Sequence, residues 1–407
     1  MRVLITCDRY LGQKHDGLTL RIVNYLKQLH GDHQFDLLCI TPVATPRNPE
    51  LDSLIDEFIP VQIEPAARAE SSFYARIKSA FDINELYLHS NQIQQRINAQ
   101  CQRKHYDLIW DAGCNMLLNL SAARQTIPLL ADQVDDAVLM LERQLSVASK
   151  LYPRLWLAKQ IMLQKQFARR HIANAAAVLF VSEADEASFR KFCPQADTHT
   201  IANGVDLEYF APIPAAASTS AKPVQAQLIF EGVMAFGPNI DAARYFCADI
   251  LPAIQCAEPT VRFSIVGRDP APEVQALAGP QVEVTGFVTD IRPYLQSAAV
   301  FVCPMRMGAG IKNKILQAWA MGMAVVSTPE GAMGLPAVDG KNILLRSKPE
   351  EFAQAVLELL HTPTLRERLG SEGRTCVEQH FSWQSKAAEF DALMRQAAAP
   401  RLKSKAQ

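Results

Sequence analysis

One stretch of the sequence, residues 300–335, restricts the fold more than any other part of the chain. It opens with an apolar run that breaks at Pro304, passes through a glycine-containing turn, and takes up helical spacing over residues 311–321. A second apolar run, residues 324–328, follows directly. This order predicts a strand, a helix and a parallel strand, whose carboxyl ends meet at one edge of a sheet, where open α/β proteins usually bind ligands.

The predicted helix carries polar residues on an arc beside its apolar side. At about 100° per residue, Lys314 and Gln317 share that arc, whereas Lys312 points elsewhere and is expected to be solvated. Gly308 and Gly310 precede the helix, whose first N–H groups together with Lys314 favour an anion, most naturally a diphosphate. An ordinary βαβ unit with a surface lysine explains the same spacing equally well, because glycine turns are weakly specific.

Length and composition exclude several other classes of protein. The 407 residues exceed one typical core and predict two domains, and the formal net charge of −1 provides no global basic field for nucleic acid. Nine cysteines lie scattered without C-x-x-C pairs or a Cys/His cluster, which argues against structural zinc and a disulfide framework and favours a reducing cytoplasm. No apolar run is long enough to predict a transmembrane helix.

Apolar runs alternate with amphipathic segments through both halves of the chain, as in doubly wound α/β proteins with parallel sheets. The first half predicts strands at residues 3–7, 35–41, 108–111, 129–131 and 178–182, the last closing the sheet, and helices at 18–29, 83–103 and 155–174. The second half predicts strands at 228–231, 263–266, 282–285, 300–303, 325–328 and 343–345, and helices at 240–246 and 384–398.

Polar turns follow two of the strands predicted in the first half. Gly17 ends the turn after the first strand, either as part of a ligand-binding loop or only as a turn residue. Asp132 and Asp135 lie at the end of the fourth strand, where a solvated acidic turn is the commoner explanation. That position also makes Asp135 a candidate for binding substrate hydroxyls or moving a proton, with Asp111 as a weaker rival.

Two glycine turns follow strands of the second half. Gly232 opens the first turn, which contains Met234 and leads through Asn239 into a helix. Gly267 opens the second, where the Arg268 guanidinium could clamp a diphosphate through two hydrogen bonds. A surface ion pair between Arg268 and its neighbour Asp269 is the alternative.

Residues 150–171 combine basic charge with aromatic and aliphatic bulk. This pattern fits a core helix with a charged outer face, the interpretation that we favour, and it also fits a helix that lies on anionic lipid. If the substrate is lipid-linked, contact with the membrane is expected here.

The motif GAGIKNKILQAWAMGMAVVSTPEGAMGL resembles the nucleotide-sugar motif of glycosyltransferase family 4, and is closest to bacterial sugar transferases of exopolysaccharide gene clusters. Residues 232–239, 266–270 and 285–290 resemble three further motifs of the family, and residues 201–210 resemble the segment that introduces its second domain. One departure is Gln317, where the family has a glutamate that accepts hydrogen bonds from the donor ribose. A neutral amide is a weaker acceptor than a carboxylate.

The resemblance implies a GT-B fold, with two Rossmann-like doubly wound domains facing a central cleft. The implied domains are 1–203 for the acceptor and 204–383 for the donor, with helix 384–398 packing back on the first and 399–407 as a disordered tail. The implied reaction moves a sugar from a nucleoside-diphosphate sugar to a hydroxyl of a saccharide or lipid-linked glycan, and the anomeric configuration of the sugar is retained. No metal and no separate cofactor are expected.

The expected location is the cytoplasm, with peripheral contact at the cytoplasmic face of the inner membrane. A GT-B scaffold that has lost catalysis and a nucleotide-sugar epimerase are the alternative functions.

The implied site divides into reacting and donor-binding groups. The catalytic candidates are Lys314, Arg268 and Asp135, and the donor-binding candidates are Gly17, Met234, Asn239, Gly267, Phe287, Gly308, Gly310, Ile311, Gln317, Glu330 and Gly331.

Overall fold

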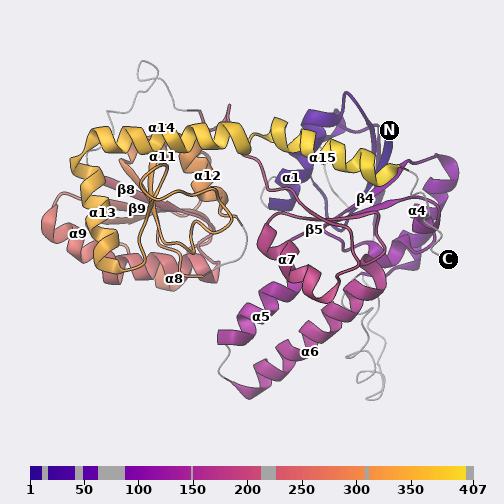
Figure 1. Ribbon diagram of the computed structural model, residues 1–407, viewed down its shortest axis with the longest axis horizontal. Coiled ribbons are helices and arrows are strands. Elements are labelled where there is room, and N and C mark those ends of the chain that lie inside the picture. The colour runs from indigo at the N-terminus through magenta and orange to yellow at the C-terminus, as the bar shows by residue number, and fades with distance from the viewer. Residues whose placement is uncertain are drawn as a thin grey trace. The chain divides into compact units, whose positions relative to one another are not determined.

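The computed structural model describes residues 1–11, 17–41, 49–62, 88–147, 150–211, 226–307 and 311–399. The chain forms two compact units (Figure 1). Unit 1 comprises Met1–Ala202 and Lys386–Gln407, and unit 2 comprises Asn203–Ser385. Residues 400–407 of the predicted tail 399–407 and the glycines Gly308 and Gly310 lie outside the described residues.

Unit 1 is built on a seven-stranded sheet in which every strand pair is parallel, in the order β3-β2-β1-β4-β5-β6-β7. The central strands are apolar because helices cover both faces of a parallel sheet. Residues 3–5 of β1, for example, are fully buried. The strands are β1 (Arg2–Cys7), β2 (Gln34–Ile40), β3 (Glu57–Val61), β4 (Leu108–Ala112), β5 (Leu129–Val134), β6 (Ala177–Phe180) and β7 (Thr198–Thr200).

The sequence missed both edge strands of this sheet. The prediction that residues 178–182 close the sheet is wrong, because β7 pairs with β6 beyond it. Strand β7 is three residues of polar sequence, and β3 contains Glu57 and Pro60. Edge strands are short and polar, since one side of each has no neighbour, and they therefore lack an apolar run.

Helices flank the sheet of unit 1 (Figure 1). Helix α1 begins at Gly17, so this glycine is the first helical residue rather than the end of the preceding loop. The helical segments are α1 (Gly17–Leu29), α2 (Pro49–Asp52), α4 (Asn91–Arg103), η2 (Leu117–Leu120), η3 (Ala123–Gln125), α5 (Ala137–Val147), α6 (Leu151–Phe167), η4 (Ala168–Ile172) and α7 (Glu183–Phe192).

Unit 2 repeats the topology with six parallel strands in the order β10-β9-β8-β11-β12-β13. All six strands predicted for this half are present, with ends shifted by about one residue. Two doubly wound parallel sheets confirm the predicted fold class. The strands are β8 (Gln227–Glu231), β9 (Arg262–Val266), β10 (Val282–Val284), β11 (Val300–Cys303), β12 (Ala324–Ser327) and β13 (Leu344–Leu345).

Helix α12 (Asn313–Ala320) connects β11 to β12 and is shorter than the predicted 311–321. Its end follows from Gly322, whose φ of 70° stops the helix while Met323 N–H donates to Ala318 O at 2.9 Å. The other helical segments are α8 (Gly237–Tyr245), η5 (Phe246–Ile250), α9 (Leu251–Ala257), α10 (Pro272–Gln275), α11 (Arg292–Ser297), α13 (Pro349–His361), α14 (Pro363–His380) and α15 (Trp383–Ala398).

Helix α15 continues from unit 2 into unit 1. In unit 2, the Trp383 ring occupies the space that a side chain at position 204 would need, so only Gly204 fits. In unit 1, Phe390 stacks on Tyr25 with ring centroids 4.3 Å apart, and Asp391 lies 2.6 Å from the His33 ring nitrogen. These contacts anchor the helix in the core of unit 1 by both apolar and polar interactions.

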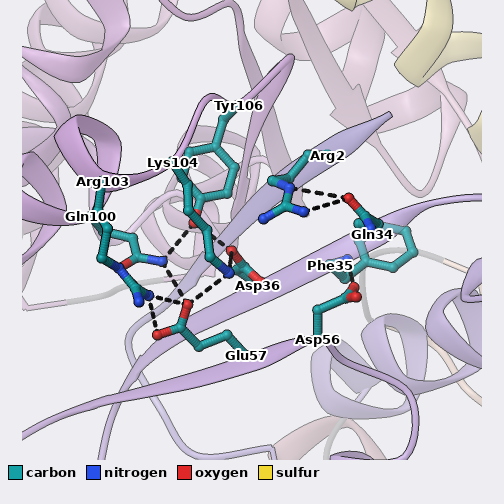
Figure 2. A network of polar contacts seen from close by, with 10 residues as sticks. All are labelled: Arg2, Gln34, Phe35, Asp36, Asp56, Glu57, Gln100, Arg103, Lys104 and Tyr106. Atoms are coloured by element: carbon teal, nitrogen blue, oxygen red, sulfur yellow. Dashed lines mark hydrogen bonds and ion pairs between the residues drawn. The ribbon is translucent and has the colours of Figure 1, made fainter.

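A polar network ties β2, β3 and α4 together in unit 1 (Figure 2). The Lys104 ammonium lies 2.8 Å from both Asp36, which is fully buried, and Glu57. Tyr106 donates to the same Asp36 oxygen at 2.6 Å, and Gln100 donates to Glu57 at 3.0 Å. Burial opposes ionisation of Glu57, but its hydrogen bonds, first of all from Lys104, lower the pKa to about 2.

The network makes the stability of unit 1 depend on pH. Because the pKa of Glu57 is lowered on folding, its contribution is complete above the ordinary value of 4.5 and is lost as the pH falls towards about 2. We expect Glu57→Gln to lower the free energy of unfolding by about 1–2 kcal/mol at neutral pH, after allowance for solvent screening. Urea unfolding of both proteins should show this difference shrink below pH 4.5; a constant difference would contradict the prediction.

Candidate functional site

The candidate site lies in unit 2, at the carboxyl ends of β8 and β11. The strand order reverses direction between these two neighbours, since β9 and β10 lie on one side and β12 and β13 on the other. Such a reversal leaves a crevice at the carboxyl ends of the strands, which is the usual ligand site of doubly wound sheets. The turns after β8, β9 and β12 and the start of α12 all lie at this edge of unit 2.

Two glycines allow the turns after β8 and β9 to touch. A side chain at Gly267 would place its β-carbon 1.7 Å from the Gly232 carbonyl oxygen, and both residues have φ near 150°. Gly232 N–H donates to Val266 O at 3.0 Å, and Met234 N–H donates to Arg268 O at 2.9 Å. The two turns are therefore held as one backbone surface.

Asn239 joins this surface to α12. Its amide nitrogen donates to Val233 O at 2.9 Å, and its amide oxygen accepts from the Lys314 ammonium at 2.8 Å. The ammonium also lies 4.2 Å from the centre of the Phe230 ring, and 2.9 Å from the position of a β-carbon at Gly232. Both ends of the Asn239 amide are used, so this residue positions Lys314 and the first turn.

The electrostatics of the site depend on burial. Burial lowers the pKa of Lys314, while the nearby Glu231 carboxylate and then the Cys303 thiol oppose that shift. Burial likewise raises the pKa of Glu231, and Lys314 opposes it. Glu231 was not predicted as a site residue, although a glutamate that ends an apolar strand is a signal that could have found it.

The position of Lys312 differs from the one expected from the sequence. Its side chain is not solvated, since the residue is only 6% exposed. It lies one position before α12 and acts electrostatically on Cys303, as Lys314 does. The site therefore contains a buried Lys312 beside the partly exposed Lys314, where the spacing of the helix predicted one lysine.

The turn after β12 is tied to β11 by hydrogen bonds. Thr328 N–H donates to Cys303 O at 3.2 Å, and Gly331 N–H donates to the Thr328 hydroxyl at 3.0 Å. A β-carbon at Gly331 would lie 2.4 Å from the Ser327 hydroxyl oxygen, so glycine is required there for close packing. Glu330, between them, is exposed and available to a ligand.

The remaining donor-binding candidates differ in accessibility. Phe287 is 66% exposed, as a stacking surface for a base requires, and Gln317 is partly exposed on α12. Ile311 packs against the turn at Gly334. The Met234 side chain is fully buried, so this residue contributes its backbone to the turn surface.

Arg268 forms the ion pair that the sequence left as an alternative. Its guanidinium lies 3.7 Å from the Asp269 carboxylate, and both side chains are exposed. Asp269 has a φ of 54°, a left-handed conformation in which its side chain is held beside Arg268. A diphosphate that binds Arg268 would compete with this carboxylate.

In unit 1, only one of the three predicted carboxylates is exposed. Asp132 is fully buried and pairs with the equally buried Arg21 at 3.2 Å. Asp111 is also fully buried and accepts from the Thr6 hydroxyl at 2.8 Å, and burial raises its pKa to about 7. Asp135 is exposed, directly after Val134, whose φ of 66° is unusual for a β-branched residue. The acidic turn thus separates into a core pair and one accessible group.

Comparison with known proteins supports a relation to glycosyltransferases. Residues 225–362 match the family described as Glycosyl transferases group 1. The spore coat protein SA of Bacillus subtilis is 22% identical over 74% of this chain and 81% of its own. The lipopolysaccharide core biosynthesis glycosyltransferase LpsE of Rhizobium meliloti is 33% identical over 25% of this chain and 30% of its own. An uncharacterised glycosyltransferase of Methanocaldococcus jannaschii aligns over only 26% of its length.

Solved structures share the fold over nearly the whole chain. Sucrose-phosphate synthase from Thermosynechococcus elongatus superposes with a TM-score of 0.68 at 19% identity, covering 97% of this chain and 98% of that one. Anabaena HepE in complex with UDP and glucose gives a TM-score of 0.65 at 16% identity, covering 97% and 99%. The chain therefore has the GT-B fold, and its second half carries a glycosyl transferases group 1 domain.

Two other features are absent from the described residues. Within those ranges no helix is long and apolar enough to cross a lipid bilayer. The same part of the chain contains no group of three or more His, Cys, Asp or Glu side chains that could hold a metal ion. That the protein works without a metal stays a prediction.

Asn239 offers a test of the site's construction. We expect Asn239→Ala to lower the free energy of unfolding by about 1–3 kcal/mol, because the Lys314 ammonium and Val233 O each lose their partner. Urea unfolding measures this change. Asn174→Ala removes an exposed asparagine in unit 1 and serves as the control, with an expected effect within about 0.5 kcal/mol. Equal stability of the two variants would contradict the arrangement.

Proposed function

We propose that this protein is a glycosyltransferase that moves a sugar from a nucleoside-diphosphate sugar to a hydroxyl of a saccharide. The observation that carries the proposal is the position of the Lys314 ammonium. Asn239 holds it beside the turn at Gly232, where the strand order of unit 2 reverses. The match of residues 225–362 to Glycosyl transferases group 1 supports the same reaction class. The relatives' names include lipopolysaccharide biosynthesis, which is compatible with an envelope or exopolysaccharide acceptor, lipid-linked or free.

The chemical role of the site is to stabilise a leaving diphosphate. The acceptor oxygen forms a bond to the anomeric carbon, the bond from that carbon to the diphosphate breaks, and its electron pair leaves with the diphosphate. Positive charge held in place before the reaction stabilises that growing negative charge, and burial strengthens the effect because water does not screen it. Lys314, Lys312 and Arg268 would supply the charge without a metal.

Other residues would bind the rest of the donor and the acceptor. Phe287 would stack on the base, Gln317 would accept from a ribose hydroxyl, and Glu330 with Gly331 would contact the sugar. Asp135 of unit 1 would bind the acceptor hydroxyl and take its proton. Retention of the anomeric configuration and membership of family 4 are part of the proposal and follow from the resemblance of the motif at residues 308–335.

Lys314 is the residue that tests the proposal most directly. We expect Lys314→Met to lower the rate of sugar transfer about 10²–10³-fold, because one preorganised charge is removed from the transition state. Methionine replaces a desolvated cation by an apolar chain of similar length, so the melting temperature should be equal or higher. Transfer is measured with the nucleotide sugar that most raises the melting temperature in a panel.

The control for Lys314 is a lysine elsewhere in unit 2. Lys341 is exposed, and Lys341→Met should leave the transfer rate unchanged. A folded Lys314→Met protein that transfers sugar at the normal rate would remove the assignment.

A second candidate function is a GT-B binding protein without catalysis, which the presence of Gln317 favours. We expect Gln317→Glu to increase the affinity for the nucleoside diphosphate about tenfold if the site is a donor site, because a carboxylate accepts the ribose hydrogen bonds more strongly. Isothermal titration calorimetry with several nucleoside diphosphates measures the change. No binding by either protein would favour the non-catalytic alternative.

A further inference from the structure

The helical pair formed by α5 and α6 presents apolar side chains to solvent. The two helices pack against each other, and the end where α5 finishes and α6 begins lies away from the strands of unit 1 (Figure 1). The side chains of Leu157, Ile161 and Phe167 face inward and join the core, as the sequence predicted for this segment. The outward-facing side chains, however, are not those of a purely charged surface.

Apolar exposure is concentrated at the beginning of α6. Every residue from 151 to 156 is exposed, including Leu151 at 73%, Tyr152 at 80%, Leu155 at 62% and Trp156 at 47%. Single exposed apolar residues are normal on protein surfaces, whereas a contiguous group indicates an interaction site. Fourteen large apolar side chains are exposed in the described part of the chain, and six belong to this pair: Met140, Leu151, Tyr152, Leu155, Trp156 and Met162.

The charge of the same segment has one sign. Residues 150–171 contain six Lys or Arg residues and neither Asp nor Glu, in a chain whose formal net charge is −1. Glu142 of α5 is an acidic neighbour, and it is neutralised by Lys165 at 2.8 Å. Lys150 and Arg154 lie at the apolar end itself, and both are exposed. The surface therefore combines apolar anchors with positive charge.

We infer that this end of the α5–α6 pair binds the surface of an anionic membrane. Leucine side chains would enter the boundary between headgroups and acyl chains, where tyrosine and tryptophan rings are favoured, while Lys150 and Arg154 would contact lipid phosphates. Two signals of this kind are needed for stable peripheral binding, and this segment carries both. The surface would bring unit 1 to a lipid-linked acceptor.

A second copy of the chain fits this surface less well. A symmetric dimer would place the same basic segment of each copy against its equivalent, and like charges that face each other oppose association. The inference does not rest on sugar transfer, because membrane binding can be measured with no nucleotide sugar present. Failure of either proposal would therefore leave the other intact.

Trp156 provides a local signal for the test. The chain has four tryptophans, and the other three are buried: Trp110 and Trp319 fully, and Trp383 with 8% exposure. On mixing the full chain with vesicles of equal parts phosphatidylglycerol and phosphatidylcholine, we expect Trp156 fluorescence to shift to shorter wavelength. Trp156→Phe should abolish the shift while the protein still sediments with the vesicles. Vesicles of phosphatidylcholine alone should bind far less.

Two matched pairs of variants measure the contributions of charge and of apolar contact. Lys150→Glu should weaken vesicle binding about fivefold or more, whereas Lys341→Glu makes the same charge change in unit 2 and should not. Leu155→Asp should weaken it more than about tenfold, whereas Val338→Asp, at a 52% exposed valine, should not. Circular dichroism checks that each variant is folded.

Three results would overturn the inference. The first is no binding to the anionic vesicles. The second is that Lys150→Glu and Leu155→Asp lose no more binding than their controls in unit 2. The third is a concentration-dependent dimer that buries Trp156 without lipid, which would identify a second copy as the occupant. Binding that high salt weakens, with the variant pattern above, would support it.

Discussion

The ammonium of Lys314 occupies a place that exists only because position 232 has no side chain. A β-carbon there would lie 2.9 Å from the Lys314 nitrogen and 2.7 Å from the Asn239 amide nitrogen. The same glycine accepts the close approach of Gly267 from the next strand. One pair of glycines thus allows two turns and a helix to meet at one edge of the sheet, and the rest of the candidate site is arranged around that contact.

Burial of this lysine has a cost that points to a ligand. An ammonium removed from water is destabilised, which is why burial lowers its pKa, and Glu231 and Asn239 recover only part of the lost hydration. Replacing such a group with an apolar one is often neutral or stabilising for the fold. Its presence is therefore explained better by the binding of an anion than by stability. Unit 1 contrasts with this, because its buried Arg21 already has Asp132 as a partner.

The two units share a strand order but use it differently. In unit 2 the carboxyl edge of the sheet gathers glycine turns with Lys312 and Lys314, a combination suited to a diphosphate. In unit 1 the same edge has Asp111 and Asp132 withdrawn into the core, whereas Asp135 is exposed. Unit 1 instead carries the exposed apolar and basic end of α5 and α6. This division is consistent with donor binding by one unit and acceptor binding by the other.

The sequence by itself determined the alternation of strands and helices, the six strands of unit 2 and the glycine turns, because each depends on residues close together in the chain. It could not determine which charged side chains lose contact with water. Asn239 and Lys314 are 75 positions apart, and Arg21 and Asp132 are 111 apart, so their burial is decided only when distant strands pair. The burial of Lys312, the pairing of the edge strands β3 and β7, and the exposure of the first residues of α6 are likewise decided by contacts between distant parts of the chain. Periodicity reports that a helix has an apolar side, and only tertiary packing decides whether anything covers it.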